Sequence, residues 1–159
     1  MFEIIPLALS HVPSLAEAYV NAPPSYSQYF TPFSFDVETL TDLLTKKRLD
    51  LYFAIVQCKS VAGFYMLRGF DQGYAIPAYG VWIAPAFSGL GLALMTLNHA
   101  VVTCQAVGCR EIMLKVHPNN LHAKAIYEKY GFKQVNSDAQ NGHIVYKLLL
   151  EQKCESVII

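Results

Sequence analysis

A glycine-containing turn between an apolar strand and an apolar helix carries the clearest chemical signal in the sequence. Residues 75–83 are strand-like, and the segment Ser88-Gly89-Leu90-Gly91-Leu92-Ala93 then opens a long apolar helix that continues to about Val107. The first N–H groups of a helix have no intrahelical partner, and the helix dipole places partial positive charge at the same end. Glycine lets a ligand approach the backbone closely. We therefore predict that backbone amides of this turn bind a phosphate group.

Two common phosphate-binding turns do not fit this segment. A P-loop closes with Gly-Lys and then Ser or Thr, whereas this chain has Gly91-Leu92-Ala93. A dinucleotide-binding turn needs a third small residue and an acid at the end of the next strand. The chain has Leu94 at the first of these positions, and its acid, Glu111, starts the next strand instead of ending it. A nucleoside triphosphate and NAD are therefore poor ligand candidates.

A third phosphate-binding pattern fits this turn, and it extends over two separate segments of the sequence. The first block reads Ile83-x-Pro85-x-x-Ser88-Gly89-x-Gly91-x-Ala93. The second block reads Val116-x-x-x-Asn120-x-x-Ala123-x-x-x-Tyr127-x-Lys129-x-Gly131-Phe132. In this order they resemble the acyl-CoA-binding motif, and the strand end and helix that follow it, in the GNAT superfamily of N-acetyltransferases. Ser88 departs from the family, which usually has Arg or Gln there, and this predicts CoA binding weaker by about 1–2 kcal/mol.

The resemblance implies a role for each matched residue. The backbone N–H of Ile83 would polarise the thioester carbonyl. Asn120 would contact the CoA arm, and the Tyr127 phenol would act as general acid towards the leaving thiolate. The cofactor contacts implied in this way are Ile83, Ser88, Gly89, Leu90, Gly91, Leu92, Ala93 and Asn120. Two structural alternatives stay open, a core-filling role for Tyr127 and a helix cap at Asn120.

The sequence is least informative about the general base. Many family members carry a glutamate on the strand before the turn, but residues 75–83 contain no acid. His117, just beyond the second strand, is the nearest group that titrates near neutral pH, and we predict it as the base. Tyr79 or a chain of waters could relay the proton instead, and a surface histidine without a role is the alternative for His117.

An aromatic loop is the predicted acceptor site, because loops over a rigid scaffold tend to carry specificity. The predicted acceptor contacts are Tyr26, Tyr29, Phe30, Phe33 and Tyr79. The absence of acids in the loop argues against polyamines, whereas its aromatic rings and hydroxyls would suit a sugar ring, a small amine or an amino-acid derivative. The alternative is a hydrophobic lid that packs on its own domain or on a second subunit, which leaves a homodimer open.

The elements expected around these residues form one mixed α/β sheet. The predicted strands are 2–7, 51–56, 61–70, 75–83, 111–116, 132–135 and 143–150, and the predicted helices are 13–22, 36–48, 90–107 and 120–130. Strand, two helices, three strands, helix, strand, helix and two strands is the GNAT order. We expect a single domain over residues 1–159. The strands that end at Ile83 and Val116 should be parallel, joined by a right-handed crossover, and splayed around acyl-CoA.

The composition of the chain limits the classes of binding partner and of cysteine chemistry that we expect. Apolar residues make up 53% of the chain and charged residues 15%, and twelve basic residues balance twelve acidic ones, which argues against a nucleic-acid partner. The four cysteines are Cys58, Cys104, Cys109 and Cys154, and their spacing favours neither a metal site nor a disulfide framework. No secretion signal or membrane span is visible. We expect a cytoplasmic protein with free thiols.

These observations predict an N-acetyltransferase that moves the acetyl group of acetyl-CoA to a primary amine of a small molecule, by direct attack in a ternary complex. Two alternatives have other functions. One is a catalytically silent GNAT-like module that binds CoA or a protein partner, motivated by Ser88 and the missing acid. The other is a structural subunit that docks through the apolar tail Val157-Ile158-Ile159.

Overall fold

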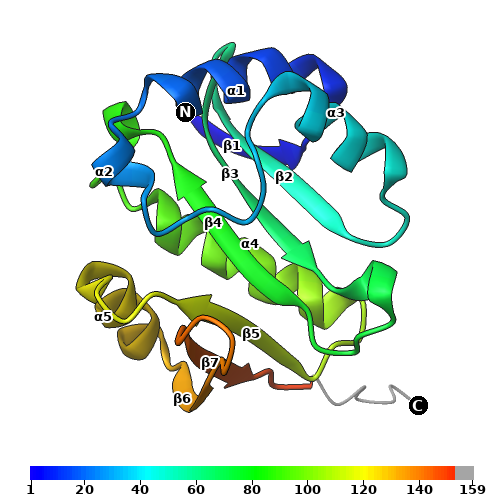
Figure 1. Ribbon diagram of the computed structural model, residues 1–159. Helices are drawn as coiled ribbons and strands as arrows, with labels where there is room; N and C mark the ends of the chain where they lie inside the picture. The colour runs from blue at the N-terminus through cyan, green and yellow to red at the C-terminus, as the bar shows by residue number, and fades with distance from the viewer. Residues whose placement is uncertain (153–159) are drawn as a thin grey trace.

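The computed structural model describes residues 1–152, so Cys154 and the apolar tail predicted as a docking element lie outside the described residues. The strands are β1 (Phe2–Pro6), β2 (Leu51–Gln57), β3 (Ser60–Arg68), β4 (Ala78–Ile83), β5 (Glu111–Val116), β6 (Lys133–Ser137) and β7 (Ile144–Leu149). They form a seven-stranded sheet in the order β1-β2-β3-β4-β5-β7-β6 (Figure 1). The β4–β5 pair is parallel and the other pairs are antiparallel. The mixed sheet and its element order confirm the predicted fold class.

Five α-helices accompany the sheet in the described residues. They are α1 (Val12–Asn21), α2 (Pro24–Ser27), α3 (Val37–Lys46), α4 (Leu92–Ala106) and α5 (Leu121–Tyr130). Asp36 caps α3 as predicted, since its carboxylate accepts the Thr39 N–H at 2.7 Å. Gly131 ends α5 in the left-handed conformation that glycine adopts without strain.

Two local predictions need correction. The segment expected to be a loop contains α2, a single helical turn, because Pro24 occupies the first helical position, where no backbone N–H is needed. The fourth strand begins at Ala78 instead of residue 75. Before it, residues 70–72 form a 3-10 turn that ends at Gly73, whose φ is 82°.

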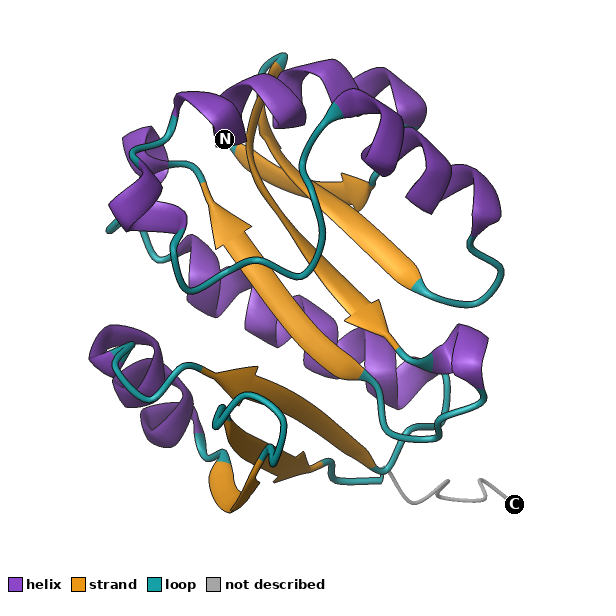
Figure 2. Cartoon of the chain, viewed as in Figure 1, coloured by secondary structure: helices purple, strands orange, loops and turns teal. Residues whose placement is uncertain are grey.

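The helices cover the two faces of the sheet, and side chains alternate between these faces along each strand (Figure 2). On one face Leu15 of α1 and Leu40 of α3 pack against Phe64 and Trp82. On the other face α4 and α5 pack against side chains of β3, β4, β5 and β7, with Tyr65, Tyr79, Ile112, Leu114 and Tyr146 buried there. The sheet therefore separates two cores, and residues that are neighbours along a strand face different ones.

The parallel strands β4 and β5 pair at a single position, at the start of β4. Their register is a single pair, Ala78 with Met113, and the Met113 N–H donates to the Pro77 carbonyl at 3.0 Å. Beyond this point the two strands diverge towards their carboxyl ends, and Figure 1 shows them separating away from the Ala78 end. The predicted splay is confirmed, and it exposes one backbone edge of β4.

Within residues 1–152, no helix combines the length and the apolar character needed to cross a bilayer.

The close pairing of β3 with β4 generates the first prediction. A Cβ added at Gly63 would lie against the Trp82 carbonyl oxygen and 3.0 Å from the Ile83 Cα, both of which are backbone atoms. We expect Gly63→Ala to lower the free energy of unfolding by about 1–3 kcal/mol, measured by chemical denaturation. Gly80→Ala is the matched control, because its nearest neighbour is the flexible Met66 terminal methyl, and its loss should be smaller. Equal stability of Gly63→Ala and the parent chain would contradict this packing.

Candidate active site

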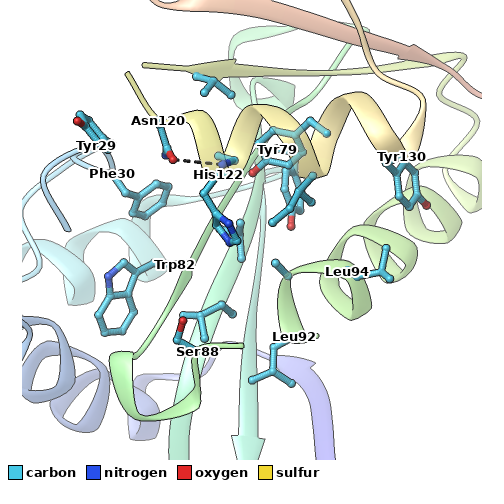
Figure 3. Close-up of a pocket in the computed structure, with 18 of the residues that line it drawn as sticks. Tyr29, Phe30, Tyr79, Trp82, Ser88, Leu92, Leu94, Asn120, His122 and Tyr130 are labelled. Carbon is cyan, nitrogen blue, oxygen red and sulfur yellow. Dashed lines mark hydrogen bonds between the residues drawn. The ribbon is translucent and has the colours of Figure 1, made fainter. Parts of the chain in front are cut away.

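The divergence of β4 and β5 opens a cleft of about 790 Å³. Its walls are the ends of the two strands, the turn before α4, the exposed side of α5, and the aromatic segment around α2. Figure 3 shows Ser88 and Leu92 on one side of the cleft, with Asn120 and His122 of the α5 start across from them. The cleft thus joins the two sequence blocks that lie in separate parts of the chain.

The turn before α4 presents unpaired backbone donors. Gly89 and Gly91 adopt φ of 77° and 78°, and an added Cβ at either would meet no atom within 4 Å. The Ser88 N–H donates to Pro85, and the next backbone N–H with a backbone acceptor is that of Met95, which bonds Gly91 at 3.0 Å. The amides from Gly89 to Leu94 are therefore free to bind an anion at the helix start.

The end of β4 offers a backbone amide to the same cleft. The Ala84 N–H donates to the Ala62 carbonyl of β3 at 2.8 Å. Because donors alternate between the two edges of a strand, the N–H and carbonyl of Ile83 face the opposite edge, where β5 has diverged. An unpaired N–H at this position suits a developing oxyanion.

Tyr127 lies on the side of α5 that faces the cleft. Its ring meets the Tyr79 ring edge-to-face at 6.3 Å and packs against Phe132. No side chain among the described residues hydrogen-bonds its hydroxyl. Burial raises the pKa of the Tyr127 phenol well above its usual value. The phenol therefore stays protonated at neutral pH, as a proton donor requires.

Tyr79 has a structural role that the sequence did not predict. Its side chain is 4% exposed, and its hydroxyl lies 2.8 Å from Thr96 Oγ1, which itself donates to the Ala93 carbonyl at 2.9 Å. Because Thr96 uses its own proton on Ala93, Tyr79 donates to Thr96. Burial also raises the Tyr79 pKa well above 10. Tyr79 lines the cleft, but its hydroxyl ties β4 to the first turn of α4, which leaves a substrate contact or proton relay unsupported.

Asn120 is the N-cap of α5, and its side-chain oxygen accepts the Ala123 N–H at 3.2 Å. The cap was the structural alternative for this residue. The two roles are compatible, because capping uses only the oxygen, and the Asn120 amide group retains two N–H donors at the cleft wall.

His117 lies at the other side of the cleft, where it stacks on Tyr29 with ring centroids 4.6 Å apart and meets the edge of His143 at 5.5 Å. Its Nδ1 accepts the Asn119 N–H at 3.1 Å. In the neutral ring this leaves the proton on Nε2. His117 is therefore a hydrogen-bond donor in this arrangement, which does not support its predicted role as general base.

Three of the four predicted aromatic loop residues line the cleft, namely Tyr26, Tyr29 and Phe30. The Tyr26 hydroxyl donates to the Ile83 carbonyl at 2.8 Å, so it occupies the exposed edge of β4. Phe33 is the exception. It packs in the core beside Phe35, with the Arg68 guanidinium 5.4 Å above its ring, and it does not reach the cleft. Leu90 also points to solvent and does not line the cleft.

The structure places in the cleft wall polar residues to which the sequence assigned no role. His122, Lys129 and Tyr130 of α5 line the cleft, and the Tyr130 hydroxyl donates to Asn98 of α4 at 2.9 Å. Lys115 of β5 also lines it and forms an ion pair with Asp138 at 2.6 Å. Tyr130 lies three residues after Tyr127, and this helical spacing could have indicated its position. The residues described contain no cluster of side chains suited to a metal ion.

Comparisons with known proteins agree with this geometry. A family model described as Acetyltransferase (GNAT) family matches residues 15–132. Individually curated proteins give no match. Among solved structures, a ribosomal-protein-alanine N-acetyltransferase from Escherichia coli is 18% identical with a TM-score of 0.72, covering 100% of both chains. A PaiA N-acetyltransferase from Thermoplasma acidophilum, in complex with coenzyme A, is 16% identical with a TM-score of 0.76, covering 94% of this chain and 99% of the other.

A third solved structure, a spermidine N-acetyltransferase chimera from Vibrio cholerae and hSSAT, is 21% identical with a TM-score of 0.74 and covers 93% of this chain and 95% of its own. At these identities the solved structures establish a common fold. The family model spans most of the chain, including both sequence blocks and the cleft between them. The chain therefore belongs to the GNAT acetyltransferase family of acyltransferases, which take the acyl group from acetyl-CoA.

Proposed function

We propose that this protein transfers the acetyl group of acetyl-CoA to a primary amine of a small molecule, by direct attack while both substrates are bound. The observation that carries the proposal is the run of unpaired amides from Gly89 to Leu94, which opens into the same cleft as the free edge of β4. These donors suit the diphosphate of CoA, while the Ile83 N–H suits the thioester oxygen.

In this proposal, different residues of the chain assist different steps of the reaction. The amine nitrogen forms a bond to the acetyl carbon, and the bond from that carbon to sulfur breaks. The Ile83 N–H stabilises the oxygen as negative charge develops there. Tyr127 gives its proton to the departing sulfur, the amine loses one proton to solvent, and Tyr127 recovers a proton from solvent. The products are an amide and the thiol of CoA, so atoms and charge balance.

No side chain is assigned as general base. Among residues 1–152, the cleft wall contains no aspartate or glutamate, and Nδ1 of His117 already accepts the Asn119 N–H. The proposal therefore has the amine lose its proton to water in the open cleft. A reaction of this type should accelerate as pH rises, because the unprotonated fraction of an alkyl amine, whose pKa is about 10.4, increases with pH.

The general-acid role is tested with Tyr127→Phe, which keeps the ring contacts with Tyr79 and Phe132. We expect turnover to fall by about 10²–10³-fold, with the KM for acetyl-CoA little changed. Thiol release in the presence of an amine panel measures both quantities. Tyr130→Phe is the matched control, because it removes a phenol that bonds Asn98, and its effect on turnover should be much smaller. An unaltered rate in Tyr127→Phe would refute the assignment.

The phosphate site is tested at Gly91, whose φ of 78° disfavours most side chains but whose Cβ position is open. Gly91→Glu would place a carboxylate beside the free amides, and we expect it to abolish the rise in melting temperature caused by CoA. Gly91→Asn is the control for backbone strain, because asparagine tolerates the left-handed conformation and carries no charge. The Asn variant should keep a measurable shift. A Glu variant that CoA still stabilises would contradict binding at these amides.

The same measurements test the alternative that the protein is a catalytically silent module that binds CoA. That function predicts stabilisation by CoA without thiol release from acetyl-CoA for any amine. It is motivated by Ser88, which supplies no long cationic side chain to the phosphates.

A further inference from the structure

We propose that the amine substrate is an α-amino acid, whose carboxylate is bound by Lys115 and His117 while its amine faces the thioester. The inference rests on the proposed acetyl transfer and narrows the amine to one chemical class. It follows from the face of the sheet on which each polar group of the cleft lies.

Alternation along β5 places Lys115 on the face opposite α4. Ile112, Leu114 and Val116 pack into the core that contains α4, so side chains at 113, 115 and 117 project from the other face. The stacking of His117 on Tyr29, which follows α2, agrees with this placement. The free amides at the α4 start, and Tyr127, His122 and Lys129 of α5, belong to the α4 face.

The cleft therefore has a cofactor side and an acceptor side, each with its own polar groups. A diphosphate held at the start of α4 lies on the cofactor side, where Lys129 and His122 are the nearby basic groups of the wall. Lys115 and His117 are the basic groups on the acceptor side. No acidic side chain among the described residues lines the cleft, so a second positive charge on the acceptor would have no acidic partner there. A carboxylate on the acceptor would have two basic partners, Lys115 and His117.

Lys115 is held in place for such a contact. Its Nζ lies 2.6 Å from Asp138 Oδ2, and its side chain is 45% exposed. An ammonium carries three donors, so one bond to Asp138 leaves two for a ligand. Asp138 itself is fixed by the Gln140 N–H at 2.8 Å, and it does not line the cleft. The pair thus immobilises the Lys115 ammonium, and Asp138 is not one of the residues that line the cleft.

His117 supplies a second donor beside Lys115 on the same face. Because Nδ1 accepts the Asn119 N–H, the neutral ring carries its proton on Nε2. Tyr29 holds the ring by stacking. Charged and neutral donors side by side are suited to the two oxygens of a carboxylate. Tyr29 and Phe30 provide an apolar wall for the carbon skeleton.

The experiment compares an amino acid with its amide and with the amine that lacks the carboxylate, namely phenylalanine, phenylalaninamide and phenethylamine. The series is repeated with alanine, alaninamide and ethylamine. Thiol release gives kcat/KM for each, expressed per unprotonated amine so that differences in basicity cancel. We expect the amino acid to exceed its amide and its decarboxylated amine by about tenfold or more in at least one series, as for a charge-assisted hydrogen bond. Amides that react as well as the acids in both series would overturn the proposal.

Substitutions then test which residue causes the preference for the amino acid over its amide. Lys115→Met keeps the aliphatic stem and should bring the acid-to-amide ratio close to one, with the KM for acetyl-CoA unchanged, whereas Lys115→Arg should retain the ratio. Lys129→Met, on the cofactor side, should change the KM for acetyl-CoA and preserve the ratio. A preference that survives Lys115→Met would contradict carboxylate binding at this lysine.

A second measurement separates this inference from the proposed function. Calorimetric titration of phenylalanine and phenylalaninamide, and of the alanine pair, into the protein saturated with CoA requires no turnover. If the acid binds more tightly than its amide and Lys115→Met removes this difference, the carboxylate site is supported. This conclusion holds even if no amine is acetylated, and in that case the proposed acetyl transfer is refuted. Equal binding of acid and amide in both pairs, together with acetylation of other amines, would refute the amino-acid assignment and leave acetyl transfer standing.

Discussion

The loss of pairing between β4 and β5 after one register position is the constraint on which the site depends. A continuous parallel sheet would satisfy every backbone group of both strands. Here the edge of β4 near Ile83 stays open, and only the Tyr26 hydroxyl bonds it in the described structure. Unpaired backbone groups in a partly buried place are unfavourable. The fold can retain them because antiparallel neighbours hold both strands, β3 on one side and β7 on the other.

Backbone donors, more than charged side chains, form the part of the cleft proposed to bind the cofactor. The positive φ of Gly89 and Gly91 lets the chain turn into α4 with its first amides exposed. The buried link from Tyr79 through Thr96 to the Ala93 carbonyl fixes that turn relative to β4. The same Tyr79 ring supports Tyr127. One buried side chain therefore sets the spacing between the turn before α4 and the Tyr127 phenol.

The sequence was most informative where the site is built from contiguous segments. The residues from Ile83 to Ala93 and from Asn120 to Tyr127 follow one another along one strand end and two helix starts. Their spacing therefore predicted the fold, and it placed the proposed cofactor contacts along one cleft. The proposed acceptor side is assembled from the segment around α2 and the end of β5, which local sequence patterns do not bring together. Phe33 was therefore assigned to the wrong environment, and Lys115 was missed. The proton on His117 depends on the neighbouring Asn119 amide, which no composition or periodicity could indicate.

The hydrogen bond from Tyr26 to the Ile83 carbonyl has a consequence for how this enzyme could change. The segment proposed to contact the amine is hydrogen-bonded to Ile83, whose amide is proposed to face the thioester, and the buried bond from Trp82 to Ser27 adds a second attachment at 3.1 Å. Altering this segment to accept new amines would also disturb the alignment of the acyl group. Broadening the range of amines should accordingly require compensating changes at the end of β4, and single replacements in the segment would tend to trade selectivity against speed.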